Sequence, residues 1–267
     1  MAAKPKRGLI VADFHTGHQL GLTPPDWDPG GDSERQVKTR QVRNLIWGFF
    51  AKAVKDYGPF DFCIANGDLV DGAQPAERGI ELILNDGLDQ VKAAVDIIQF
   101  IGAKKNYLSF GTPYHTGKAE DWESQIKEKL TDKGKKTEIG GHEWLTANGL
   151  MVSYRHHIGS SSIPHGRHTP MAREHLWEQL WAERGDYPKS DLIIRSHVHY
   201  YTVTGGHGWI GLTTPALQGY GVKYARRLSG MVDIGVIMLD VVDAQHWTWT
   251  PIILRGMGHL RTKPHIV

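Results

Sequence analysis

The sequence has few of the features that mark secreted, membrane-spanning or strongly charged proteins. It contains one cysteine, Cys63, so no internal disulfide can form, which suits a reducing compartment. Its apolar runs are all much shorter than the roughly 20 residues that span a bilayer, and its basic start lacks the apolar stretch of a signal peptide. The formal net charge is only +2, too small for a strong overall attraction to nucleic acid. We therefore expect a cytoplasmic protein with no membrane partner.

Length and composition indicate one globular domain. The chain has 267 residues, of which 40% are hydrophobic and 22% are charged, both ordinary fractions for a globular protein. At this length folding buries roughly three quarters of the unfolded surface, so a core requires neither a disulfide nor a structural metal. No linker, repeat or low-complexity segment is evident. We expect a single domain over residues 1–267.

Strand and helix patterns alternate in the first half of the chain. Apolar runs typical of buried strands lie at 8–12, 60–65 and 107–110, and patterns with helical spacing lie at 34–55, 77–101 and 119–131. This alternation favours parallel strands with helices packed outside them.

The second half is richer in strand patterns. Strands are predicted at 150–155, 192–195, 200–204, 209–212, 232–241 and 247–254, with one helix at 170–184. Late strands of this kind often pair antiparallel, so we infer an α/β fold, a mixed sandwich of two sheets with helices outside. Trp177 and Trp181 are four residues apart in the predicted helix, which predicts a buried stripe.

Acidic and imidazole side chains gather directly after four of the apolar runs. They are Asp13 and His15, then Asp68, then His156 and His157, and finally His197 and His199. Because ligands gather at the carboxyl edge of an open α/β sheet, we expect these groups to meet there. Imidazole with carboxylate suits manganese, iron, zinc or nickel better than calcium or magnesium. The sequence therefore predicts a site for two divalent metal ions, which can clamp a phosphate ester and deliver a hydroxide to it.

The order of these blocks resembles that of the calcineurin-like metallophosphoesterases. That family carries Asp-x-His, Gly-Asp, Gly-Asn-His, a single His and Gly-His-x-His. The corresponding blocks here are Asp13-Phe14-His15, Gly67-Asp68, Gly111-Thr112-Pro113-Tyr114-His115, His156-His157 and Ser196-His197-Val198-His199. The resemblance covers about residues 8–200 and implies one domain with the four-layer αββα sandwich of that family, built from two mixed sheets.

The resemblance implies a role for each matching residue. Asp13, His15 and His199 resemble ligands of the first metal, and Asp68 resembles the carboxylate that bridges both metals.

For the second metal, the resemblance implies His197 and one residue of the His156/His157 pair. His156 is preferred because it comes first after the strand, and His157 stays an alternative because a shift of one residue would exchange them.

The third block departs from the family pattern. The family's Asn is a ligand of the second metal, and the following His interacts with the phosphate or protonates the leaving group. Thr112 stands at the Asn position and is a poorer neutral ligand, while His115 comes two residues late. A loop with Gly and Pro can still bring His115 to the site. This variant block is similar to one seen in metallophosphoesterases from phages and prophages.

Other basic residues are candidates for substrate binding. Arg167 and His168 follow the His156/His157 block and, with His115, could grip a substrate phosphate. A solvated loop is the alternative for Arg167 and His168. The basic segments 133–136 and 223–227 could touch a nucleic-acid backbone, although a solvated turn is the default interpretation of each.

The expected function is hydrolysis of a phosphate ester that depends on two metals and uses a metal-bound hydroxide. Asp68 bridges the metals in this scheme, and His115 is the catalytic acid. A phosphodiester, such as a nucleotide or nucleic acid, is preferred because the net charge is near neutral. The alternatives are a metal- or nucleic-acid-binding module with impaired catalysis and a mononuclear metal hydrolase. The pattern indicates no particular oligomeric state.

Overall fold

The computed structural model describes residues 4–74, 78–116, 121–220 and 231–255. Its helices are α1 (Glu34–Tyr57), α2 (Gly87–Ile101), α3 (Pro113–Thr116), α4 (Trp122–Asp132) and α5 (Thr169–Glu183), with short 3-10 turns at Pro25–Trp27 and Pro164–His168. None of the helices in these ranges has both the length and the apolar character needed to cross a membrane.

The strands form two mixed sheets. The first has the order β11 (Trp247–Ile253), β10 (Gly235–Val241), β1 (Lys6–Val11), β2 (Phe62–Asn66), β3 (Lys105–Ser109) and β4 (Lys136–Gly140). The second has the order β5 (Glu143–Ala147), β6 (Leu150–Tyr154), β7 (Leu192–Arg195), β9 (Trp209–Thr213) and β8 (Thr202–Gly206). Strands β1 to β4 are parallel, as are β6, β7 and β9, whereas β5, β8, β10 and β11 pair antiparallel.

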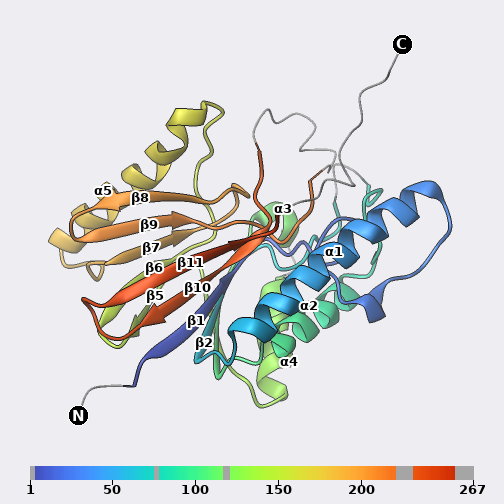
Figure 1. Ribbon diagram of the computed structural model, residues 1–267, viewed down its shortest axis with the longest axis horizontal. Coiled ribbons are helices and arrows are strands. Elements are labelled where there is room, and N and C mark those ends of the chain that lie inside the picture. The colour runs from blue at the N-terminus through green and yellow to red at the C-terminus, as the bar shows by residue number, and fades with distance from the viewer. Residues whose placement is uncertain (1–3, 75–77, 117–120, 221–230, 256–267) are drawn as a thin grey trace.

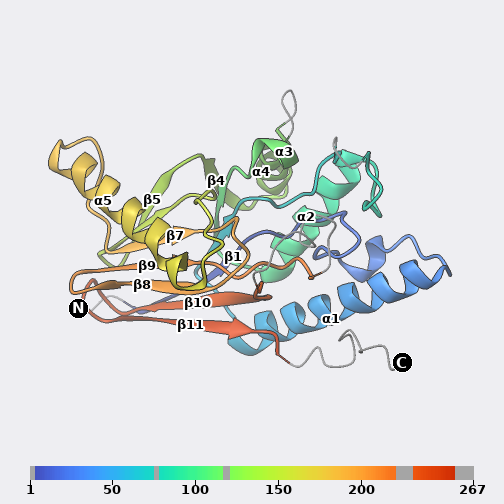
Figure 2. The same ribbon diagram turned by 90° about the horizontal axis from the view of Figure 1, so that it is seen from above.

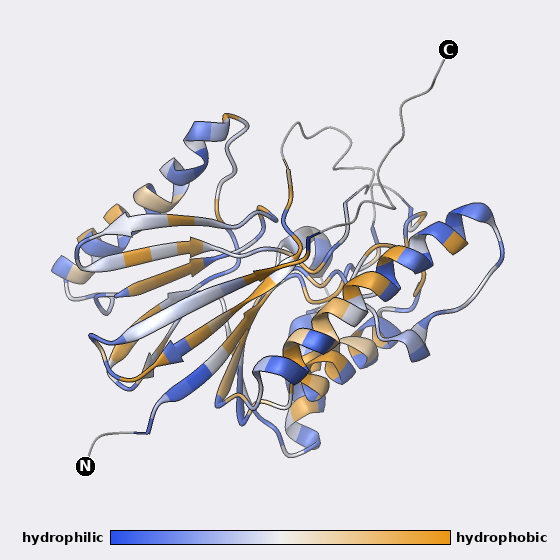
Figure 3. Cartoon of the chain, viewed as in Figure 1, coloured by the Kyte–Doolittle hydropathy of each residue, from blue (hydrophilic) through white to orange (hydrophobic). Residues whose placement is uncertain are grey.

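Helices cover the outer faces of both sheets, so the expected four-layer sandwich is confirmed. Helices α1 and α5 lie on opposite sides of the paired sheets (Figures 1 and 2). Successive side chains of β1 point to opposite faces of the sheet. Leu9 packs in the core under α1, α2 and α4, and Ile10 packs in the core between the sheets. A strand buried on both faces reads as a continuous apolar run, and such runs are plain in Figure 3.

Local sequence signals explain where the long helices begin. The hydroxyl of Ser33 accepts from the backbone of Gln36 in a capping box before α1. The carboxylate of Asp86 caps α2 by accepting from Leu88 N at 2.8 Å. Helix α2 therefore starts at Gly87, and the expectation of a helix from residue 77 is wrong for residues 78–86.

Strands β4 and β5 were not expected from the sequence. Each lies at the edge of its sheet, and β4 alternates exposed and half-buried residues, so it carries little apolar signal. The expected buried stripe on α5 is also wrong, because 56% of Trp177 and 36% of Trp181 are exposed. Helix α5 turns Met171 and Glu178 toward the second sheet instead.

Candidate metal centre

The parallel strands of both sheets deliver the candidate ligands to one end of the sandwich. The loops that follow these strands are tied to one another by backbone hydrogen bonds. Asp13 N donates to Gly67 O at 3.0 Å, and Ser196 N donates to His156 O at 2.8 Å. Asn66 at the end of β2 also donates from Nδ2 to Arg155 O at 3.0 Å, which joins the loops of the two sheets.

Asp13, His15 and His199 form the first cluster, with one potential ligand atom from each lying within 4.8 Å of the others. Nε2 of His199 lies 3.2 Å from Asp13 Oδ1 and 3.3 Å from Nε2 of His15. Two imidazole nitrogens and a carboxylate oxygen that face one point are a suitable donor set for zinc, iron or manganese.

Asp68, His156 and His197 form the second cluster. Nδ1 of His156 donates to Asn66 O at 2.7 Å, which leaves its Nε2 to face Asp68 Oδ2 at 3.0 Å. The same Nε2 lies 3.9 Å from Asp13 Oδ1, so the two clusters adjoin.

Two buried atoms at this junction, Asp13 Oδ1 and His156 Nε2, lie close to His199 and Asp68 but make no hydrogen bond of good geometry within the described residues. Buried polar atoms are rarely left without a partner. A cation at each cluster would satisfy both atoms, so the residues present fit divalent metal ions.

The backbone at these ligands is strained. Eight of the described non-glycine residues have a positive φ, and five of them are candidate ligands: Asp13, His15, Asp68, His197 and His199. A left-handed backbone is unfavourable for most side chains and concentrates at functional sites. Each strand end turns sharply in this way, which places its side chain in the shared space.

The charge states suit metal binding. Burial opposes ionisation of Asp68, but His156 and His115 nearby lower its pKa well below the usual range. Burial lowers the pKa of His197 to about 4, so its imidazole is neutral at pH 7. Burial opposes the charged form of His156, and the Asp68 carboxylate outweighs this and raises its pKa. A cation that binds His156 must therefore displace a proton.

The third block reaches the site despite its altered spacing. Thr112 donates its backbone N–H to Asp68 Oδ1 at 2.6 Å, and its hydroxyl lies 3.2 Å from the same oxygen. The short helix α3 then turns His115 back, so its Nδ1 donates to Asp71 O at 2.9 Å and its Nε2 lies 4.0 Å from Asp68 Oδ2. A Cβ on Gly111 would lie 2.2 Å from Asp68 Oδ1, which explains glycine there.

The structure adds two acidic residues that were given no role from the sequence. Asp71 Oδ1 accepts from Nδ1 of His15 at 2.9 Å. Its place three residues after Asp68 in the same turn was the available signal. Glu123, at the start of α4, is fully buried and accepts from Leu69 N at 3.4 Å. Burial and the Asp68 charge raise the pKa of Glu123 to about 8, and no local pattern indicated this contact.

Three other candidates lie outside these clusters. His157 is exposed, and its ring centroid is 4.9 Å from that of His197. The guanidinium of Arg167 lies 4.3 Å over the Tyr200 ring, and His168 Nδ1 is 3.2 Å from Thr204 Oγ1. The substrate roles of Arg167 and His168 stay predictions. Of the two basic segments, 223–227 lies outside the described residues.

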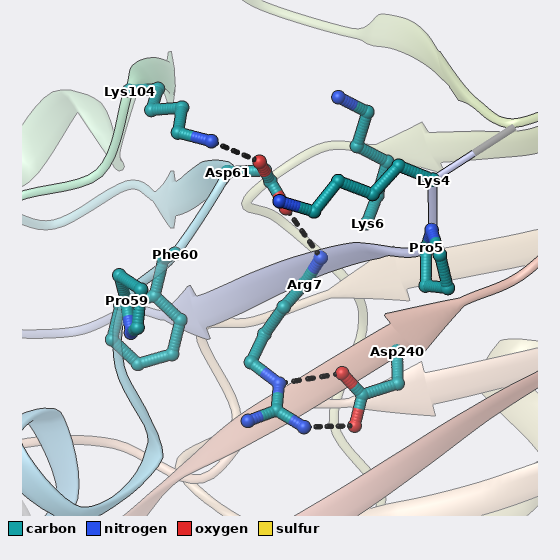
Figure 4. Close-up of a pocket in the computed structure, with 9 residues that line it drawn as sticks. All are labelled: Lys4, Pro5, Lys6, Arg7, Pro59, Phe60, Asp61, Lys104 and Asp240. Carbon is teal, nitrogen blue, oxygen red and sulfur yellow. Dashed lines mark hydrogen bonds and ion pairs between the residues drawn. The ribbon is translucent and has the colours of Figure 1, made fainter.

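A surface pocket lies at the amino ends of β1, β2 and β3, whereas the candidate ligands follow the carboxyl ends of the strands (Figure 4). Its charges are largely paired there: Arg7 with Asp240 at 2.7 Å, and Lys104 with Asp61 at 2.7 Å. No candidate ligand lines it, and its paired charges give it no evident chemistry.

Comparisons with known proteins find only distant structural similarity. No family model matches the chain, and no curated protein sequence matches it. Similar solved structures include Vps29 from Entamoeba histolytica in complex with zinc, with 14% identity over 92% of this chain and 98% of that chain and a TM-score of 0.44. An archaeal phosphodiesterase has 12% identity over 93% and 99% of the chains and a TM-score of 0.46.

A predicted phosphoesterase from Streptococcus pneumoniae has 8% identity over 94% and 100% of the chains and a TM-score of 0.40. The order of the ligand blocks and the two mixed sheets between outer helices are this chain's own features. In both respects the chain resembles the calcineurin-like metallophosphoesterases.

Proposed function

We propose that this protein is a phosphoesterase that binds two divalent metal ions and hydrolyses phosphodiesters. The observation that carries the proposal is the junction of the two clusters. Asp13 Oδ1 lies 3.2 Å from His199 in the first cluster and 3.9 Å from His156 in the second. Two adjoining clusters, each with one carboxylate and two imidazoles, suit a pair of cations that share one substrate phosphate.

Different side chains of the site have different roles in the proposed hydrolysis. Bound cations would polarise the phosphoryl oxygens and activate a water molecule. Asp68 and Asp13 supply the negative charge that holds them, and the imidazoles set their positions. His115 lies at the open side of the site, with Nδ1 fixed by the carbonyl of Asp71, so Nε2 is the atom that can give a proton to the leaving oxygen.

A diester substrate is favoured by the shape and charge of the protein. The side chains of His199 and His115 keep 20% and 17% of their surface exposed, while Asp13, Asp68 and His156 are buried. Solvent and substrate can therefore reach the site beside these imidazoles. With a formal net charge of +2 the chain offers little extra attraction for a dianionic monoester. Nucleotides and nucleic acids are the diesters we expect it to act on.

The test compares the wild type with Asp68→Asn on a bis-aryl diester, an aryl monoester and a short oligonucleotide, each with Mn²⁺. The wild type should favour the diester over the monoester, and loss of the carboxylate charge should lower turnover on the order of 100-fold or more. Asp56→Asn, at a surface ion pair on α1, serves as the control. Unchanged turnover in Asp68→Asn would refute the proposal.

Elemental analysis of the purified protein separates the alternatives. Two metals per chain with turnover support the proposal. One metal per chain would favour a mononuclear hydrolase, and two metals without turnover would favour a binding module.

A further inference from the structure

Four charged side chains form a cluster beneath α5, outside the metal centre. Arg195, at the end of β7, is fully buried, and its Nε donates to Glu174 Oε2 at 3.1 Å. Its Nη2 donates to Glu178 Oε1 at 2.7 Å. Arg155, just after β6, donates from Nη2 to the same Glu174 oxygen at 2.5 Å. Glu174 on α5 therefore joins two arginines from neighbouring strands.

Along the chain, each of these arginines lies within two residues of a candidate ligand of the second cluster. Arg155 directly precedes His156, and Arg195 is two residues before His197. The two strand ends are also joined to each other, because Arg155 N donates to Ile194 O at 3.2 Å. Because each imidazole follows its arginine closely along the chain, we expect a shift of one strand end relative to the other to change the spacing of the two imidazoles.

The cluster is an unusual way to attach a helix to a sheet. Helix α5 leaves Leu176, Trp177 and Leu180 about half exposed, while it turns the carboxylates of Glu174 and Glu178 toward the sheet. The pair of Arg195 with Glu178 is buried, whereas Glu174 and Arg155 are partly exposed. Breaking a buried pair leaves an uncompensated charge, so Arg195 is held firmly against α5.

We propose that Glu174 is a positioning residue for the second cation, because it holds the strand ends that carry His156 and His197 at the spacing this cation needs. The inference rests on the proposed two-cation site. It concerns α5, which contributes no ligand to either cluster.

The test is a calorimetric titration of metal-free protein with Mn²⁺, which reads metal affinity without any turnover. Glu174→Gln keeps the size of the side chain and removes its charge. Loss of a partner bonded directly to a metal ligand weakens binding about 10-fold or more. Glu174 acts through the neighbouring arginines, so we expect binding of the second equivalent to weaken by about 10-fold at most and binding of the first to stay unchanged. Glu183→Gln, an exposed carboxylate on the same helix, is the control and should match the wild type.

Further outcomes separate the possibilities. An unchanged two-site isotherm in folded Glu174→Gln, or equal weakening at both sites, overturns the proposal. If thermal unfolding shows that Glu174→Gln does not fold, Arg155→Gln repeats the test from the other side of the ion pair, with the same expected loss and the same overturning result. A wild type that binds fewer than two ions also overturns it. A wild type that binds two ions without turnover overturns only the proposed function.

Discussion

Asp71 accepts a hydrogen bond from Nδ1 of His15 at 2.9 Å, and this bond directs Nε2 of His15 toward His199. Asp71 is itself buried and held by the amide of Gln74. A carboxylate behind a metal-binding imidazole fixes the ring orientation and raises the basicity of the ligand. Asp71 thus fixes the orientation of the His15 ring in the first cluster.

Replacement of Asp71 should weaken binding of a cation at the first cluster. Burial opposes the charge of Asp71, but the bond from His15 outweighs it and lowers the Asp71 pKa to about 2. Asp71→Asn keeps the shape and removes this charge, and we expect affinity at the first site to fall about 10- to 100-fold in a Mn²⁺ titration. Asp56→Asn, at a surface ion pair on α1, should leave both sites unaltered. Equal affinities in the two variants would show that Asp71 has no such role.

The adjacent histidines His156 and His157 should differ sharply. His156 is buried beside Asp68, whereas His157 is exposed. We expect His156→Ala to bind one metal ion fewer per chain by elemental analysis and His157→Ala to retain the full complement. Metal loss in His157→Ala alone would mean that the alternative assignment is right.

His115 should matter most for poor leaving groups. If it protonates the leaving oxygen, His115→Gln should lower kcat by about 100-fold or more on a dialkyl diester, whose leaving group is an alkoxide. The loss should be much smaller on a bis-aryl diester with an acidic phenol, because that leaving group needs no proton. Metal content should stay unchanged. An equal loss on both substrates would instead indicate a role in binding.

The stability of the metal-free protein should fall as the pH rises from the ordinary pKa of a glutamate, 4.5, toward the raised pKa of Glu123, about 8. Burial and the Asp68 charge raise the pKa of Glu123 from 4.5 to about 8. Above pH 4.5 the unfolded chain releases this proton while the folded protein keeps it, so the stabilisation present at low pH is lost toward pH 8.

Glu123→Gln keeps a neutral group and removes this dependence. Relative to the variant, the free energy of unfolding of the wild type should drop by on the order of a few kcal/mol between about pH 5 and pH 8. Urea titrations in the presence of a chelator measure it. Glu128→Gln, exposed on the same helix, should follow the wild type. Parallel curves for wild type and Glu123→Gln would contradict a buried, protonated Glu123.

Much of the fold could be predicted because buried strands and amphipathic helices have recognisable patterns of apolar and capping residues in the local sequence. The run before Asp13 is apolar because β1 is buried on both faces, and the start of α1 is marked by its cap at Ser33. Trp177 on α5 shows the limit of these patterns. Helical spacing predicts which residues share a face, but contact with the second sheet decides which face is buried.

The same division holds for the candidate site. By itself the sequence determined which side chains follow strand ends, and so which donor types are available, because that depends only on neighbours along the chain. Tertiary structure decided that His156 rather than His157 faces Asp68, that α3 turns His115 back, and that Glu123 and Glu174 support the loops from distant helices. Such contacts join residues far apart in the chain, and their geometry exists only once both sheets and their helices have packed.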